Sequence, residues 1–160
     1  MARAKIKCFV SYAHADDAYV KPFMAALTEM LKPSKTYDFE LWRDTGILPG
    51  ENWLHEIEAA LGTCSLGLLL VSPAFLGSEF ITSKEISRFT GDNAKPVIPV
   101  MLKKVNFDRH DLKGLEATQI YQYHAGPNIY HSFAQCGSKQ KAEFIYDLHE
   151  NIEKRLEKLA

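Results

Sequence analysis

The hydrophobic pattern of this chain switches repeatedly between short apolar runs and longer segments with helical periodicity. Leu66–Val71 is apolar without alternation and stops at Ser72 and Pro73. Such a run predicts a strand that is buried on both faces, as in a parallel sheet covered by helices on either side. Residues 6–12 and 95–102 are similar runs, and they predict two more strands of the same sheet.

Two further segments have weaker strand patterns. Tyr37–Trp42 alternates apolar and acidic residues, which predicts a strand near the edge of the sheet. Residues 119–123 predict a short fifth strand, preceded by an irregular stretch and followed by a loop over residues 124–137.

The segments between the strands have helical spacing. Asp16 or Asp17 is expected to cap a helix, in which Pro22 predicts a kink or a later regular start. We expect further helices over residues 52–61, from Ser78 onward, and over Ser138–Leu159. The predicted core faces of the first and last helices are Val20, Phe23, Met24, Leu27 and Leu31, and Ile145, Leu148, Ile152 and Leu156.

Strand and helix patterns alternate about five times, which favours an open α/β fold with right-handed crossovers. We therefore predict a flavodoxin-like, doubly wound sheet of five parallel strands in the order 2-1-3-4-5, with helices on both faces. The 160 residues are 46% hydrophobic and 24% charged, which suits a single domain over residues 1–160. We expect this domain to be part of a longer chain.

Composition narrows the function classes. A net charge of −1 provides no basic field for nucleic acid or an anionic membrane, and no apolar run approaches transmembrane length. The cysteines Cys8, Cys64 and Cys136 are odd in number and scattered, which favours reduced core thiols in a cytoplasmic protein. We expect no metal, because His124, His131 and Cys136 have no common ligand spacing.

The expected topology points to a ligand site. The sequence has no phosphate-binding P-loop, no dinucleotide-binding glycine motif after its first strand and no nucleophile elbow. In doubly wound sheets, ligands bind at the carboxyl ends of the strands where the strand order reverses. Here the reversal would lie between strands one and three. The loops of residues 12–15 and 72–77, which leave these two strands, would therefore border a crevice beside the loop of residues 43–51.

Glu85 is the unusual residue of the helix expected after the third strand. Ile81, Glu85 and Phe89 are four residues apart, so they share one face of that helix. A carboxylate between two apolar residues either faces the crevice or lies at the edge of the stripe, solvated or paired with Arg88.

Three segments together resemble the signature boxes of a Toll/interleukin-1 receptor (TIR) domain, most closely those of bacterial members. They are FVSYAHADD, ELWRDTGILPGENW and LGLLLVSPAFLGSEFITSKEI. The resemblance implies a flavodoxin-like fold and places Glu85 at the catalytic position of the NAD⁺-cleaving members. It also implies that residues 43–51 are an assembly loop. The aromatic residue that the family usually has four positions before the glutamate is replaced here by Ile81.

This assignment predicts how NAD⁺, as substrate and not as a cofactor, is bound. A lone carboxylate suits the reaction, because neutral nicotinamide leaves without an acid while positive charge develops on the ribose. Arg43 and the helix N-terminus near Asp16 could bind the pyrophosphate, and Trp42 or Trp53 could stack on a base; for Trp42 an ordinary core role is the alternative. The predicted substrate-binding residues are Tyr12, Ala13, His14, Trp42, Arg43, Asp44, Leu48, Trp53 and Ile81.

The sequence thus predicts an NAD⁺ hydrolase that yields nicotinamide and ADP-ribose or a cyclic product, acts in defence or signalling, and is activated by self-assembly. The alternative is a non-catalytic adaptor that binds other TIR domains through Ile47, Leu48 and neighbouring helices. Ile47, Leu48 and Pro49 are the predicted assembly-loop residues; the alternative for Ile47 and Leu48 is that they fold back under the loop and seal the core. Both hypotheses allow filaments of TIR domains. A receiver domain is disfavoured, because Ser72 follows the third strand where a receiver has an aspartate.

Overall fold

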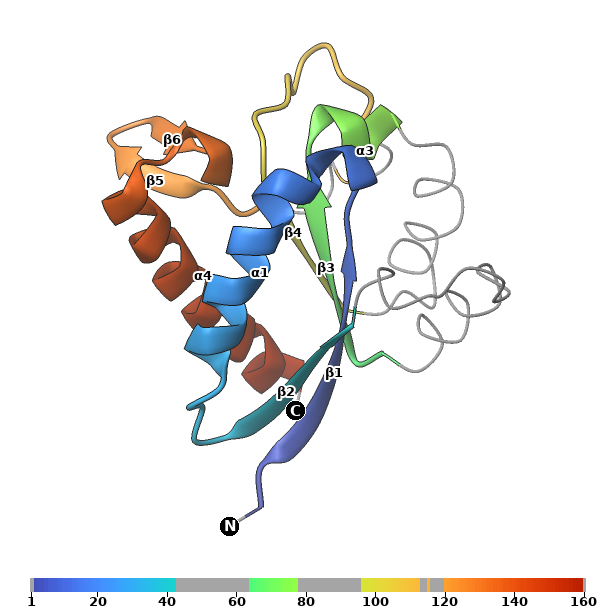
Figure 1. Ribbon diagram of the computed structural model, residues 1–160, viewed down its shortest axis with the longest axis vertical. Coiled ribbons are helices and arrows are strands. Elements are labelled where there is room, and N and C mark those ends of the chain that lie inside the picture. The colour runs from blue at the N-terminus through green and yellow to red at the C-terminus, as the bar shows by residue number, and fades with distance from the viewer. Residues whose placement is uncertain (1, 43–63, 78–95, 113–114, 116–119, 160) are drawn as a thin grey trace.

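Figure 1 shows a computed structural model of the protein. It describes residues 2–42, 64–77, 96–112, 115 and 120–159. The helices predicted for residues 52–61 and from Ser78 onward lie outside the described residues, as does the loop of residues 43–51. Those assignments stay predictions.

The centre of the molecule is a parallel sheet of four strands. The strands are β1 (Ala4–Ser11), β2 (Tyr37–Trp42), β3 (Leu66–Val71) and β4 (Val97–Met101), in the order β2-β1-β3-β4. In the register, Phe9 lies beside Trp42, Ser11 beside Leu69 and Val71 beside Met101. The predictions of a parallel sheet, of β2 at its edge and of β3 in its interior are confirmed.

Strand β3 is buried on both faces, as its continuous apolar run predicts. Leu66, Leu68 and Leu70 pack into one hydrophobic cluster, while Leu69 and Val71 pack into a second cluster. Successive side chains of a strand point to opposite faces, so the two clusters are the two sides of the sheet. An alternating polar pattern would have exposed one of these sides to water.

Two long helices cover one face of the sheet (Figure 1). Helix α1 (Asp17–Leu31) follows a short 3-10 turn, η1 (His14–Asp16), and helix α4 (Ser138–Leu159) closes the chain. The core residues predicted for both helices are buried. Helix α1 begins at Asp17 and continues through the exposed Pro22, so the later start that Pro22 suggested is wrong.

Aromatic rings fix α4 against α1 and the sheet. Phe133, in a 3-10 turn η6 (Phe133–Gln135), packs edge-on against Phe23 of α1 at 5.2 Å and against Phe144 of α4 at 5.4 Å. Tyr121 meets Phe144 at 5.0 Å in the same geometry and donates its hydroxyl hydrogen to the Phe144 carbonyl. Edge-to-face pairs contribute roughly 0.5–1.5 kcal/mol each beyond the burial of their area. This aromatic cluster therefore stabilises the packing of α4 against α1.

Beyond β4 the predicted fifth strand is reduced, within the described residues, to a single parallel bridge between Val100 and Tyr121. The chain then pairs with itself in a hairpin, β5 (Tyr123–Gly126) and β6 (Ile129–His131), where a loop was predicted. Asn128 has a φ of 59° at the turn, a conformation that asparagine tolerates better than most residues. After Tyr121 the described chain therefore pairs within its own hairpin and no longer with β4.

Candidate functional site

The carboxyl ends of β1 and β3 lie side by side at the reversal of strand order. Strand β1 is paired with β2 on one side and with β3 on the other, and β4 lies beyond β3. The segment of residues 12–15 leaves β1 and the segment of residues 72–77 leaves β3. The topology therefore brings together the two segments that the sequence predicts to border a crevice.

The segment after β3 is a short helix, α3 (Pro73–Gly77), where the sequence predicted a loop. The Ser72 side-chain oxygen accepts a hydrogen bond from the Phe75 backbone N–H at 3.0 Å, and proline is favourable at the first helical position. Phe75 and Leu76 are buried in the same hydrophobic cluster as Leu69 and Val71 of β3. Ser72 and Pro73 therefore begin a helix immediately where the strand ends.

Asp16 is a buried carboxylate at the carboxyl edge of the sheet. It is 1% exposed, and the Ser72 hydroxyl donates a hydrogen bond to its Oδ2 atom. Lys103 Nζ lies 2.8 Å from its Oδ1 atom. Asp16 stands at the N-cap position of α1, as predicted, but its side chain does not bond the helix backbone. Because a buried carboxylate needs partners, the Ser72 and Lys103 contacts replace the capping bond.

Lys103 completes what we call the Asp16 cluster, formed by Asp16, Ser72 and Lys103. Its backbone N–H donates to the Val71 carbonyl at 3.2 Å, and its ammonium lies 4.5 Å from the centre of the Tyr19 ring. The cluster therefore ties together the ends of β1, β3 and β4. The sequence pattern does not predict this cluster, because nothing in the spacing of Asp16, Ser72 and Lys103 pairs them with one another.

The described substrate-binding candidates lie near this edge with different exposures. Tyr12 and Ala13 are buried, while His14 is exposed and stacks on the Tyr12 ring at 5.8 Å. Trp42, at the end of β2, is half-buried and stacks on Phe9 at 5.1 Å. One face of the indole is therefore already occupied by a core contact.

The remaining candidates lie outside the described residues, and their roles stay predictions. They are Glu85, Arg43, Asp44, Trp53 and Ile81, together with Ile47, Leu48 and Pro49 of the predicted assembly loop.

The three thiols are free and buried, as predicted. Burial raises the pKa of the Cys8 thiol, and the neighbouring Cys64 raises it further. Cys136 donates a hydrogen bond to the Ser132 carbonyl at 3.3 Å. Within the described ranges, no group of three histidine, cysteine, aspartate or glutamate side chains is arranged to hold a metal ion. None of the helices described there is long and apolar enough to cross a membrane.

These features define a class of protein: an α/β domain with a central parallel sheet and a polar cluster at the carboxyl edge of that sheet. The family described as "TIR domain" matches residues 8–134, and the chain therefore belongs to the TIR domain family. Members of this family act in signalling, as adaptors that bind other TIR domains or as enzymes that cleave NAD⁺. No curated protein matches the sequence.

Proposed function

We propose that this TIR domain cleaves the bond between nicotinamide and ribose in NAD⁺, with Glu85 as the catalytic carboxylate. The observation that carries the proposal is the pairing of β1 with β3 at the reversal of strand order. This pairing sets residues 12–15 beside the start of the segment that leads through α3 toward Glu85. The resemblance to NAD⁺-cleaving members adds the identity of the carboxylate.

The chemistry requires only one acidic group. The C–N bond breaks with its electron pair going to the ring nitrogen, so the pyridinium becomes neutral nicotinamide and needs no proton. Positive charge develops on the ribose, where a carboxylate stabilises the transition state more than the ground state. Water then attacks the same ribose carbon and loses a proton, which gives ADP-ribose; attack by a nucleophile of the substrate itself gives a cyclic product.

The described residues support a substrate site at this edge in different ways. His14 is exposed and can contact a ligand, whereas Tyr12 and Ala13 are buried and serve as walls. Trp42 offers at most the ring face that Phe9 leaves uncovered. The Asp16 cluster acts as a positioning element, because it holds the segments that border the site in a fixed relation.

Self-assembly is the second part of the proposal. Ile47 and Leu48 are apolar residues in a segment rich in glycine and proline, a composition typical of a contact surface. Burial of both side chains against a neighbouring subunit would contribute roughly 2–4 kcal/mol before ordering costs. A contact with a different surface of the next subunit is heterologous, so it propagates into open filaments.

Chromatography of NAD⁺ incubated with concentrated protein tests the proposal. We expect nicotinamide to appear in equal amounts with ADP-ribose or a cyclised form of it. If NAD⁺ stays intact at protein concentrations where the domain self-associates, the enzymatic proposal is wrong and the adaptor function is favoured.

A further inference from the structure

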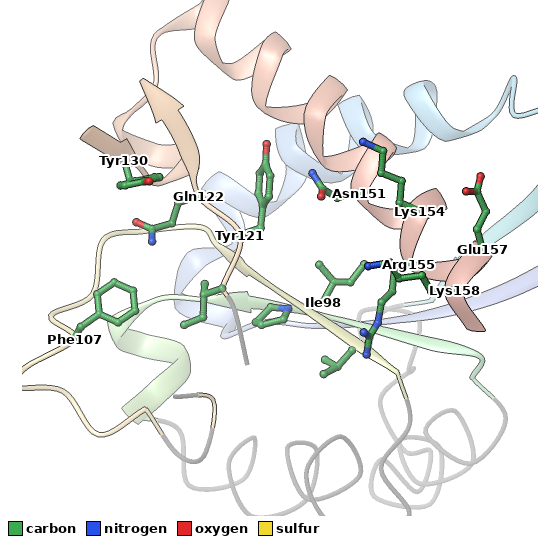
Figure 2. A pocket seen from close by; sticks show the side chains of 13 residues that line it. Ile98, Phe107, Tyr121, Gln122, Tyr130, Asn151, Lys154, Arg155, Glu157 and Lys158 are labelled. Atoms are coloured by element: carbon green, nitrogen blue, oxygen red, sulfur yellow. The ribbon is translucent and has the colours of Figure 1, made fainter. Parts of the chain in front are cut away.

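A groove of about 1040 Å³ runs between the C-terminal half of α4 and strand β4 (Figure 2). This volume is at the upper end of the range for pockets that bind small molecules. It begins beside Val97 at the amino end of β4, whereas Lys103 of the Asp16 cluster follows the carboxyl end of that strand. The groove shares no residue with the candidate site.

Cations line one side of the groove. Lys154, Arg155 and Lys158 are exposed residues of α4 within about one turn of each other. Among the described residues, no carboxylate lies within ion-pair distance of any of the three. Glu157 is the acidic residue of this lining. Like charges at this spacing repel each other, and a bound anion would relieve that repulsion.

Aromatic rings stand at the other end of the groove. Phe107 is 50% exposed and Tyr130, on β6, is 52% exposed. Figure 2 shows these two rings beyond Gln122, while Arg155 and Lys158 extend from α4 toward Ile98. Exposed lysines alone are common on protein surfaces. Here the groove also holds exposed rings, and its cations have no carboxylate partner in the described part of the chain, which indicates a ligand with both a flat and an anionic part.

The lining changes from aromatic rings at one end of the groove to cations at the other, and each part suits a different part of a ligand. Aromatic faces stack on planar bases, side-chain amides such as that of Gln122 bond the edges of a base, and arginine binds phosphate oxygens through its planar fork. Lysines add point charges for further phosphates. We propose that this groove binds a nucleotide with two or more phosphates, its base at Phe107 and Tyr130 and its phosphates at Arg155 and Lys158.

Titration of ¹⁵N-labelled protein with ADP, followed by NMR, locates the binding. We expect the amide signals of Ile98, Gln122 and the last two turns of α4 to shift at low salt. The affinity should fall as salt is added, because exposed charges are screened. The proposed substrate site could also bind a nucleotide, so the location of the shifted signals distinguishes the two sites. Shifts confined to residues 12–16 at the carboxyl edge would refute nucleotide binding in the groove and would leave the NAD⁺ proposal unaffected.

Matched variants test the phosphate end. Lys158→Met removes a groove cation, while Lys139→Met removes the same charge from the exposed N-terminal turn of the same helix. We expect Lys158→Met to weaken ADP binding by roughly fivefold to tenfold and Lys139→Met to change it less than about twofold. Equal effects of the two variants would refute the assignment of phosphate to this groove.

The ring end has its own pair of variants. Tyr130 and Tyr146 are equally exposed at 52%, and Tyr146 lies outside this groove. We expect Tyr130→Ala to weaken ADP binding by roughly tenfold and Tyr146→Ala to leave it unchanged. Tripolyphosphate should bind more weakly than ADP and should not respond to Tyr130→Ala. If tripolyphosphate binds as tightly as ADP, the groove is a general anion site and the nucleotide assignment is wrong.

Discussion

The Asp16 cluster makes a sharp prediction about stability. Replacing Lys103 by Met keeps most of the side-chain volume but removes the ammonium from both the Tyr19 ring and the Asp16 carboxylate. The carboxylate is then left with only the Ser72 hydroxyl. A buried carboxylate that loses its counter-charge destabilises the folded state, because the unfolded chain returns it to water.

The magnitude follows from the exposure of the two partners. Removing one member of a buried ion pair costs about 3–5 kcal/mol. The Asp16 side chain is 1% exposed but that of Lys103 is 32% exposed, so water already screens part of the attraction. We therefore expect Lys103→Met to lower the free energy of unfolding by about 2–3 kcal/mol. For a domain of this size, that corresponds to a fall in Tm of roughly 5–10 °C.

Lys21, which pairs with the exposed-side neighbour Asp17 in the first turn of α1, provides the control. Lys21 Nζ lies 3.1 Å from Asp17 Oδ2, but these side chains are 69% and 38% exposed. We expect Lys21→Met to cost less than about 0.5 kcal/mol in urea unfolding at neutral pH. Lys103→Met combined with Asp16→Asn should cost less than Lys103→Met alone, because no unpaired buried charge remains. Equal midpoints for Lys103→Met and Lys21→Met would refute the reasoning.

Three further predictions concern titration, thiols and assembly. The hydrogen bond that Tyr123 donates to Glu143 raises the Tyr123 pKa from 10.0 to about 12. The stability that this bond contributes to the folded state is therefore fully present below pH 10 and is lost as the pH rises toward 12. The alkaline absorbance difference between wild type and Tyr123→Phe should therefore have its midpoint near pH 12; a midpoint near 10 would contradict the bond. The three thiols should react with Ellman's reagent only after unfolding, and a thiol that reacts in the folded protein would contradict their burial. Specific NAD⁺-cleaving activity should rise with protein concentration for wild type and less for Ile47→Asp, whereas equal, flat profiles would refute activation by assembly.

The parts of the fold that the sequence predicts are those with a clear hydrophobic pattern, either a continuous apolar run or a helical spacing of apolar residues. The apolar run of Leu66–Val71 places a strand in the sheet interior, and the spacing of Ile145, Leu148, Ile152 and Leu156 predicts the buried face of α4. The pattern of residues 124–137 predicts a loop where the structure has the β5–β6 hairpin, because these strands are too short to show alternation. The adjacent Gly126 and Pro127 were a turn signal within that segment.

Of the candidate site, the sequence predicts the position in the fold but not the contacts between its polar side chains. Topology predicts where strand ends meet, and the meeting of β1 with β3 is confirmed. The partners of Asp16 could not be predicted from spacing, because Ser72 and Lys103 are far from it in sequence and polar residues between elements show no period. Only the folded chain shows that the aspartate bonds a serine and a lysine instead of capping its own helix.

The measurement that tests the central proposal most directly compares NAD⁺ cleavage by wild type and Glu85→Gln at equal, high protein concentration. The substitution keeps the shape of the side chain and removes its charge, and Glu29→Gln on the exposed face of α1 is the matched control. We predict that Glu85→Gln lowers the rate by roughly a hundredfold or more, about 3 kcal/mol of transition-state stabilisation, while the control keeps wild-type activity. Equal rates for wild type and Glu85→Gln would show that this carboxylate does not carry the reaction.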